Sequence, residues 1–302
     1  AGCQSAIGKK IVLHVCYSQQ YFAHTPTNSM EKLALVAEKL NEYDYVCFHE
    51  PEALDVEVLK QLHDEQYVNA FLTGEPRKLA SIQGFKPWSE QLRDAVLSVN
   101  AGQLKAAELA FEHGLAANIA QGFHHASPDF GCAYCTFNGL ALVAQQYPDK
   151  RIFILDCDQH GGNGTAEFVL KLPNLYNFSI YGQAFGCGSY ERAETRHIHQ
   201  TQGSFNEYQQ AIHEGFAAAK AWGADLIIYQ AGMDCHQDDP HGSAWFSTDL
   251  IEKREELVFR LAKQSHIPML FVLAGGYQKL SKLVPLHVRT FEIAQAIYYP
   301  DE

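Results

Sequence analysis

The stretch RIFILDCDQHGGNG, residues 151–164, indicates the fold class. Its first part, residues 151–156, is a nearly continuous apolar run, which is typical of a parallel strand buried on both faces. The second part changes abruptly to acids, histidine, asparagine and glycine. Parallel α/β sheets bind ligands just beyond the carboxyl ends of their strands, so this change of composition marks a candidate site.

The same succession of a short apolar run and a helical pattern recurs along the chain. Further strands are predicted at 11–17, 45–48, 175–181, 225–230 and 268–274. Amphipathic stretches with helical spacing are found at 31–43, 56–71, 88–111, 205–222 and 248–263. This alternation predicts an α/β fold with a mainly parallel central sheet and helices on both faces. No linker or repeat divides the chain, so we interpret residues 1–302 as a single domain, with 1–10 as a tag or a processed end.

Charge and hydropathy exclude several classes of function. The chain has 302 residues and a net charge of −12, so its field repels the phosphates of nucleic acids. No apolar run approaches the roughly 20 residues of a membrane-spanning helix, and the first residues lack a signal-peptide pattern. We therefore expect a soluble cytoplasmic protein that binds neither membranes nor nucleic acid directly. A nuclear or secreted location remains open.

The eight cysteines are too sparse for a disulfide scaffold, and we expect them to be reduced thiols. Cys132 and Cys135 form a CxxC pair, but no second CxxC or matching Cys/His pair follows. We therefore interpret the pair as small residues packed under a loop, and not as a redox or zinc site.

Acids and histidines follow two of the predicted strands. Asp156, Asp158 and His160 alternate and share one face if the strand continues that far. Asp234 lies beyond another strand, in AGMDCHQDDPHG. Together Asp158, His160 and Asp234 would leave a divalent metal with open positions, as a catalytic site requires. Turn formation is the alternative explanation for the two acids of the first strand, but the acid beyond the second strand argues against it.

An open-coordinate zinc ion lowers the pKa of its water to about 7 and polarises a carbonyl, which favours amide hydrolysis. Such a reaction also needs a base, an acid and a donor for the oxyanion. His124 and His125 can transfer the protons, and the phenol of Tyr277, which follows a Gly-Gly turn, can be the donor.

Four motifs occur in the order that is found in a known family: GFHHASPDFGCAYCTFNG, DCDQHGGNGTAEF, AGMDCHQDDPHG and LAGGY. They resemble the zinc-dependent histone deacetylase family, with its histone-deacetylase-like and acetylpolyamine amidohydrolases. The resemblance extends from about residue 61 to residue 277 and is loose over the first 50 residues. It implies an arginase/deacetylase fold with about eight strands, one catalytic Zn²⁺ ion and inhibition by hydroxamates.

The resemblance also implies roles for the residues that carry chemistry. The zinc ligands of the family correspond to Asp158, His160 and Asp234. Tyr277 corresponds to the transition-state tyrosine and His125 to the general base and acid, while His124 has an electrostatic role and is oriented by Asp156. The positions that bind substrate are Gly122 at the tunnel floor, Tyr134 at its wall, His241 at its rim, and Gly275. A structural K⁺ site would involve Asp156, Asp158, His160 and Ser179.

The motif DxDxHHGDG of the family reads DCDQHGGNG in this chain, so Gly161 replaces a histidine and Asn163 replaces an acid. In the resemblance, that acid backs the second histidine of the pair. Asn163 can accept a hydrogen bond from His125 but cannot stabilise an imidazolium by charge, so we expect His125 to be less basic. The class IV branch and many bacterial homologues share this asparagine, and we do not interpret it as a loss of activity.

The leading hypothesis is removal of an acetyl or other acyl group from lysine side chains of proteins such as histones, which would make the protein a chromatin regulator. Acetylated polyamines remain an alternative, since a negative protein suits either cationic substrate. A binuclear manganese ureohydrolase would need a carboxylate where Gly162 stands. A non-catalytic acetyl-lysine binding module would need no proton-transferring histidines. His197 and His199 have metal-like spacing without acids nearby, and we expect them in a solvated loop.

Overall fold

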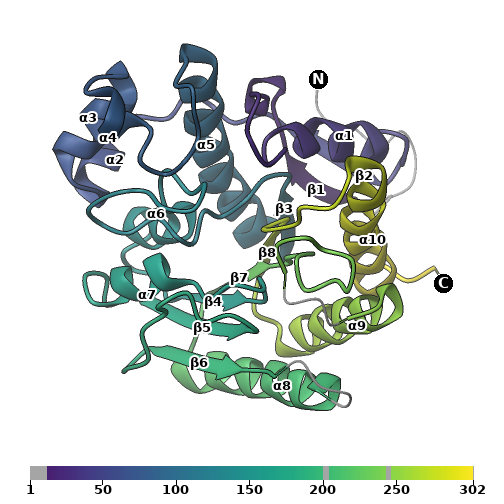
Figure 1. Ribbon diagram of the computed structural model, residues 1–302. Coiled ribbons are helices and arrows are strands. Elements are labelled where there is room, and N and C mark those ends of the chain that lie inside the picture. The colour runs from purple at the N-terminus through teal and green to yellow at the C-terminus, as the bar shows by residue number, and fades with distance from the viewer. Residues whose placement is uncertain (1–11, 200–203, 243–245, 302) are drawn as a thin grey trace.

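The structure, a computed structural model, describes residues 12–199, 204–242 and 246–301. A parallel sheet of eight strands forms the centre of this part of the chain (Figure 1). The strand order is β2-β1-β3-β8-β7-β4-β5-β6. The strands are β1 Leu13–Cys16, β2 Val46–His49, β3 Leu115–Asn118, β4 Ile152–Asp156, β5 Leu175–Tyr181, β6 Ala193–His197, β7 Leu226–Gln230 and β8 Met269–Val272. The single-sheet α/β architecture with about eight strands is thus confirmed.

Two layers of helices cover the sheet (Figure 1). The first layer packs on β1, β3, β4 and β5 and consists of α5 Glu90–His113, α6 Gly139–Gln146 and α7 Asn163–Val169. The second layer packs in the spatial order α1, α10, α9, α8 and consists of α1 Glu31–Leu40, α10 Leu280–Tyr298, α9 Thr248–Ser265 and α8 Ser204–Trp222. Three short helices adjoin the first layer: α2 Glu57–Leu62, α3 Glu65–Thr73 and α4 Arg77–Ala80.

Several elements differ from the predictions. The strands β3 and β6 were not predicted, because LAAN is rich in alanine and AETRH is a polar, half-exposed edge strand. The helix predicted over 56–71 is broken at His63, whose backbone is extended and whose ring donates to the Ser127 carbonyl, 2.8 Å away. The helix α10 was also missed, since Pro285 lies inside it.

We expected His197 in a solvated loop, but it is the last residue of the edge strand β6. It is exposed, and its ring nitrogen donates to the Gly182 carbonyl at 3.0 Å. Its ring also lies against His199, with centroids 4.4 Å apart.

Six cysteines of the described residues are free thiols, as expected: Cys16, Cys132, Cys135, Cys157, Cys187 and Cys235. The prediction of reduced thiols is wrong at Cys47, which is disulfide-bonded. The number and spacing of cysteines do not reveal which sulfurs the fold brings together.

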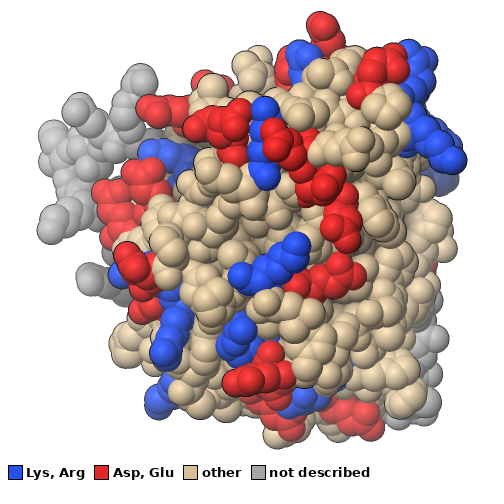
Figure 2. Space-filling model, turned by 90° about the vertical axis from the view of Figure 1, so that its left-hand side faces the viewer, with Lys and Arg blue, Asp and Glu red and all other residues tan. Residues whose placement is uncertain are grey.

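None of the described helices is both long and apolar enough to cross a lipid bilayer. On the face drawn in Figure 2, acidic and basic side chains are interspersed. That face therefore offers no continuous basic surface of the kind that nucleic-acid binding uses.

A buried arginine of α9, Arg254, holds the loop after β7 by a hydrogen bond. Arg254 of α9 is fully buried, and its guanidinium donates to the Gly232 carbonyl at 2.7 Å and to the Glu255 carboxylate at 2.8 Å. The Tyr229 hydroxyl donates to the same carboxylate. Arg254 thereby connects the second helical layer to the loop that follows β7.

We predict that Arg254→Ala lowers the free energy of unfolding by about 3–5 kcal/mol, because it leaves the Glu255 charge buried and unpaired. Arg260→Ala, at an exposed position of the same helix, should change it by less than about 0.5 kcal/mol. Urea unfolding followed by circular dichroism measures both. Equal losses in the two variants would show that the buried pair does not have this role.

Candidate active site

Three adjacent strands deliver the polar residues of the site. In the sheet β4, β7 and β8 are neighbours, and because they are parallel their carboxyl ends lie at one edge. The loop after β4 carries Asp158 and His160, the loop after β7 carries Asp234, and the loop after β8 carries Tyr277. The sheet order thus converts three distant segments of sequence into one cluster.

The three predicted metal ligands meet at this edge. One ligand atom each of Asp158, His160 and Asp234 lies within 4.8 Å of the others. The Nδ1 atom of His160 is 3.1 Å from Asp234 Oδ2 and 3.4 Å from Asp158 Oδ1. Both carboxylates are buried, with exposed fractions of 0% for Asp234 and 3% for Asp158. The set is suited to a divalent cation that has open coordination positions.

Backbone N–H groups fix the carboxylates in place. Asp158 accepts from His160 N at 2.9 Å and from Gly275 N at 2.8 Å, and Asp234 accepts from Gln159 N at 2.9 Å. A Cβ atom on Gly275 would collide with carboxylate oxygens of both acids. Gly275, which we predicted to bind substrate, therefore holds the metal-ligand set together and also lines the pocket beside it.

The charges of the cluster indicate that it fits a cation. Burial and the neighbouring Asp158 raise the pKa of Asp234 to about 7. Burial also opposes ionisation of Asp158, but His124 and His160 outweigh it and hold the pKa of Asp158 well below its usual range. Burial lowers the pKa of His160, but the two acids outweigh it and raise that pKa to about 11. A divalent cation would supply the positive charge that this imidazolium provides.

The paired histidines each have a partner for Nδ1. His124 donates to Asp156 Oδ2 at 2.6 Å, and His125 donates to Asn163 Oδ1 at 2.6 Å. The two rings are 4.1 Å apart. Burial lowers the pKa of His124, but Asp156 and then Asp158 outweigh it and raise it to about 9. Burial and the neighbouring His124 lower the pKa of His125 to about 3. The pair is thus one charged and one neutral imidazole.

A pocket opens beside these side chains. It is lined by residues that include Asp158, His124, His125, Tyr134, Gly275 and Tyr277. Tyr134 belongs to a two-residue turn in which Ala133 (φ 44°) and Tyr134 (φ 66°) are both left-handed, although neither is glycine. Two hydrogen bonds between Cys132 and Cys135 close this turn. Left-handed conformations of such residues persist only where their surroundings enforce them, and here they place the Tyr134 ring at the pocket wall.

Four other predicted residues, Gly122, His241, Asp156 and Ser179, are not among those that line this pocket. Gly122 is buried behind it, where a Cβ would meet Leu140 and Gln230. His241 is exposed, and its ring packs edge-on against Tyr277 with centroids 5.0 Å apart. Asp156 and Ser179 of the predicted K⁺ set are paired in register on β4 and β5, and both are fully buried.

Three residues of the site escaped the sequence reasoning. Lys32 of α1 lines the pocket, and its Nζ donates to the Ala274 carbonyl at 2.6 Å. The ring of Phe185 is 4.1 Å from that of His125 and is 41% exposed. Asp239 accepts from Tyr277 N at 2.8 Å and so anchors its loop. The signal for Lys32 was its position on the apolar face of an amphipathic helix.

Residues 26–291 match the family model of the histone deacetylase domain. This chain belongs to the histone deacetylase domain family. It is 32% identical to histone deacetylase 2 of Arabidopsis thaliana over 61% of this chain and 49% of that protein. It is 29% identical to the acetylpolyamine amidohydrolase of Mycoplana ramosa over 61% of this chain and 58% of that enzyme. The matches therefore span about half the length of these two deacetylases.

Other relatives match over more of their length. A probable deacetylase of Archaeoglobus fulgidus is 27% identical over 88% of this chain and 82% of that protein. An acetylpolyamine aminohydrolase from Burkholderia pseudomallei has a similar fold, with a TM-score of 0.76, 17% identity, and coverage of 94% of this chain and 99% of the other. The arginase/deacetylase fold expected from the motifs is thereby confirmed.

We predict that added Zn²⁺ raises the melting temperature of the metal-free protein and that Asp234→Asn abolishes this rise, because one of three ligands loses its charge. Zinc at 100 times its Kd should stabilise the wild type by about 2.7 kcal/mol. Asp238→Asn is the matched control, since the Asp238 side chain is 70% exposed. An undiminished zinc response in Asp234→Asn would remove Asp234 from the site.

Proposed function

We propose that the protein is a zinc-dependent amidohydrolase that removes an acetyl group, or another short acyl group, from an amine. The observation that carries this proposal is the cluster of Asp158, His160 and Asp234. Its Asp158 lines a pocket together with two histidines and a tyrosine, His124, His125 and Tyr277. Membership of the histone deacetylase domain family supports it. A binding module would need no such arrangement of proton-transferring groups.

Asp158, His160 and Asp234 would hold the zinc ion. When bound, the ion would supply an acidic water and a Lewis acid for the acyl carbonyl. We propose K⁺ for the structural cation, near Asp156 and Ser179, which are buried side by side on adjacent strands.

His125 is suited to be the general base. Its Nδ1 carries a proton, because the Asn163 amide oxygen can only accept, and so its Nε2 has a free lone pair. With its pKa lowered to about 3, the ring is neutral at neutral pH. It can take a proton from the attacking water and return it to the leaving amine. His124, charged and hydrogen-bonded to Asp156, contributes a fixed positive potential.

Tyr277 is suited to stabilise the oxyanion. Burial and the charges of Asp158 and Asp234 raise the pKa of its phenol well above the usual value, so the hydroxyl keeps its proton and can donate. The bond from Tyr277 N to Asp239 fixes the residue at the pocket. Such a donor strengthens its interaction as negative charge develops in the transition state.

The charge of the protein and its relatives support our choice of substrate class. The net charge of −12 favours an acylated cation, either acetyl-lysine in a protein such as a histone or an acetylated polyamine. We propose acetyl-lysine as the principal substrate. The similarity to acetylpolyamine amidohydrolases keeps the polyamine as the second candidate.

The decisive assay compares turnover of an acetyl-lysine peptide and of acetylated polyamines by the zinc-loaded protein. Tyr277→Phe should lower kcat by about 10²- to 10³-fold, because one oxyanion donor is lost, while zinc content stays the same. Tyr43→Phe, at a half-buried tyrosine of another surface, should retain wild-type kcat. Absence of turnover on both substrates would refute the proposal. Turnover of polyamines alone would make an acetylated polyamine, and not acetyl-lysine, the principal substrate.

A second variant tests the role of Asn163. Asn163→Asp places a negative charge on His125 Nδ1, which raises the histidine pKa by about 1 to 3 units. Since the base acts in its neutral form, the acid limb of the pH profile of kcat/KM should move to higher pH. Asn69→Asp, at an exposed position of α3, should leave the profile unchanged. Superimposable profiles for Asn163→Asp and wild type would count against His125 as the base.

A further inference from the structure

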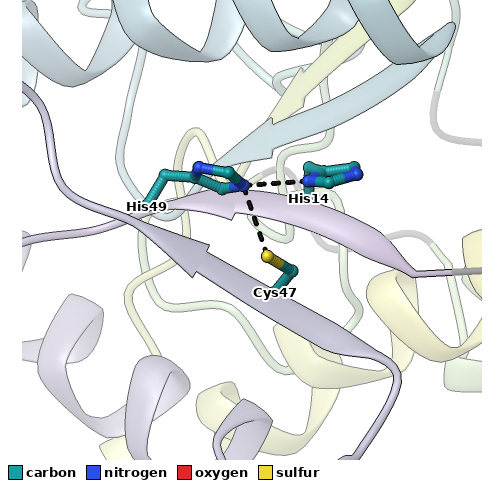
Figure 3. A group of neighbouring side chains, drawn as sticks. All are labelled: His14, Cys47 and His49. Carbon is teal, nitrogen blue, oxygen red and sulfur yellow. Dashed lines mark hydrogen bonds between the residues drawn. The ribbon is translucent and has the colours of Figure 1, made fainter. Parts of the chain in front are cut away.

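A second group of metal-ligating side chains lies at the far edge of the sheet (Figure 3). His14 comes from β1, and Cys47 and His49 come from β2. His14 and Cys47 are paired in register, and His49 follows two residues later on the same face of β2. Neighbouring parallel strands thus present two imidazoles and one sulfur to a single point.

The three donor atoms are close together. His14 Nδ1 is 2.8 Å from His49 Nε2, and Cys47 Sγ is 3.4 Å from the same His49 nitrogen. Around a tetrahedral zinc ion the corresponding separations are about 3.3 Å and 3.6 Å, from the usual Zn–N and Zn–S bond lengths. Binding therefore requires the two nitrogens to separate by about half an ångström, which side-chain rotation can provide.

The surroundings favour neutral imidazoles with available lone pairs. Burial, together with His113 and His49, lowers the pKa of His14 to about 4, and burial also lowers the pKa of His49. The ring of His113 stacks on His14, with centroids 3.7 Å apart, and so limits its rotation. Cys47 is 2% exposed, while the two histidines are partly exposed, so an ion can approach from the side of the imidazoles.

In the structure Cys47 is in a disulfide, and a disulfide sulfur is a poor ligand for zinc. We propose that His14, Cys47 and His49 form a redox-gated site for Zn²⁺ or a similar borderline cation, which opens when a dithiol reduces this disulfide. In that step the dithiol gives its two hydrogens to the two protein sulfurs, and its own sulfurs join in a disulfide. Binding of the cation then displaces the Cys47 thiol proton, and water completes the coordination.

The site is chemically distinguishable from the catalytic one. The catalytic set offers two carboxylates and one imidazole, whereas this set offers a thiolate. Cobalt(II) bound to a thiolate shows an intense charge-transfer absorption in the near ultraviolet, which oxygen and nitrogen ligands do not produce. The test therefore does not depend on catalytic activity.

The experiment adds Co²⁺ to protein whose catalytic site already holds zinc, before and after reduction with dithiothreitol and anaerobic desalting. We expect the charge-transfer band with one equivalent of Co²⁺ in the reduced protein only. Cys47→Ser should abolish the band. His14→Asn keeps the thiol and should weaken Co²⁺ affinity at least tenfold. Cys132→Ser, at a half-buried cysteine outside this site, should keep the full band.

A reduced wild type without the band overturns the proposal, and so does a band of equal intensity in Cys47→Ser or in the unreduced protein. Circular dichroism verifies that each variant is folded. If Cys47→Ser does not fold, His14→Asn decides: unchanged Co²⁺ affinity in that variant overturns the proposal.

Discussion

Two negative charges buried next to each other are the constraint on which the rest of the site depends. Asp158 and Asp234 are almost inaccessible to water, and burial together with the repulsion from Asp158 raises the pKa of Asp234 to about 7. Three backbone N–H groups and the His160 ring counteract that repulsion. A buried pair of carboxylates is suited to bind a cation. The roles that we propose for the paired histidines and for Tyr277 depend on that cation.

The order of strands makes this pairing possible. Because β4 and β7 are neighbours and parallel, the loops after them place Asp158 and Asp234 together, and β8 beside β7 adds Gly275 and Tyr277. On the other side, α7 begins with Asn163, which accepts from His125, while burial and the neighbouring His124 keep the pKa of that ring low. The Asn163 amide thus gives His125 a hydrogen-bond acceptor without the negative charge that an acid would add.

The polar residues that follow buried strands were predictable, because apolar runs reveal parallel strands and the strand ends converge at one edge. Residues that depend on packing were not. Lys32 reaches the pocket from the opposite helical layer, and Phe185 comes from a loop without a motif. Half of the residues of strand β3 are alanine, and the strand is held by its pairing with neighbouring strands. The disulfide of Cys47 depends on proximity in space, which spacing does not encode.

The central claim is that one zinc ion is held by Asp158, His160 and Asp234. Anomalous X-ray diffraction at the zinc absorption edge, on crystals of the unreduced zinc-loaded protein, tests it most directly. The account predicts one strong peak about 2.0–2.2 Å from a ligand atom of each of the three residues. A peak at other residues, or none at these three, would contradict it.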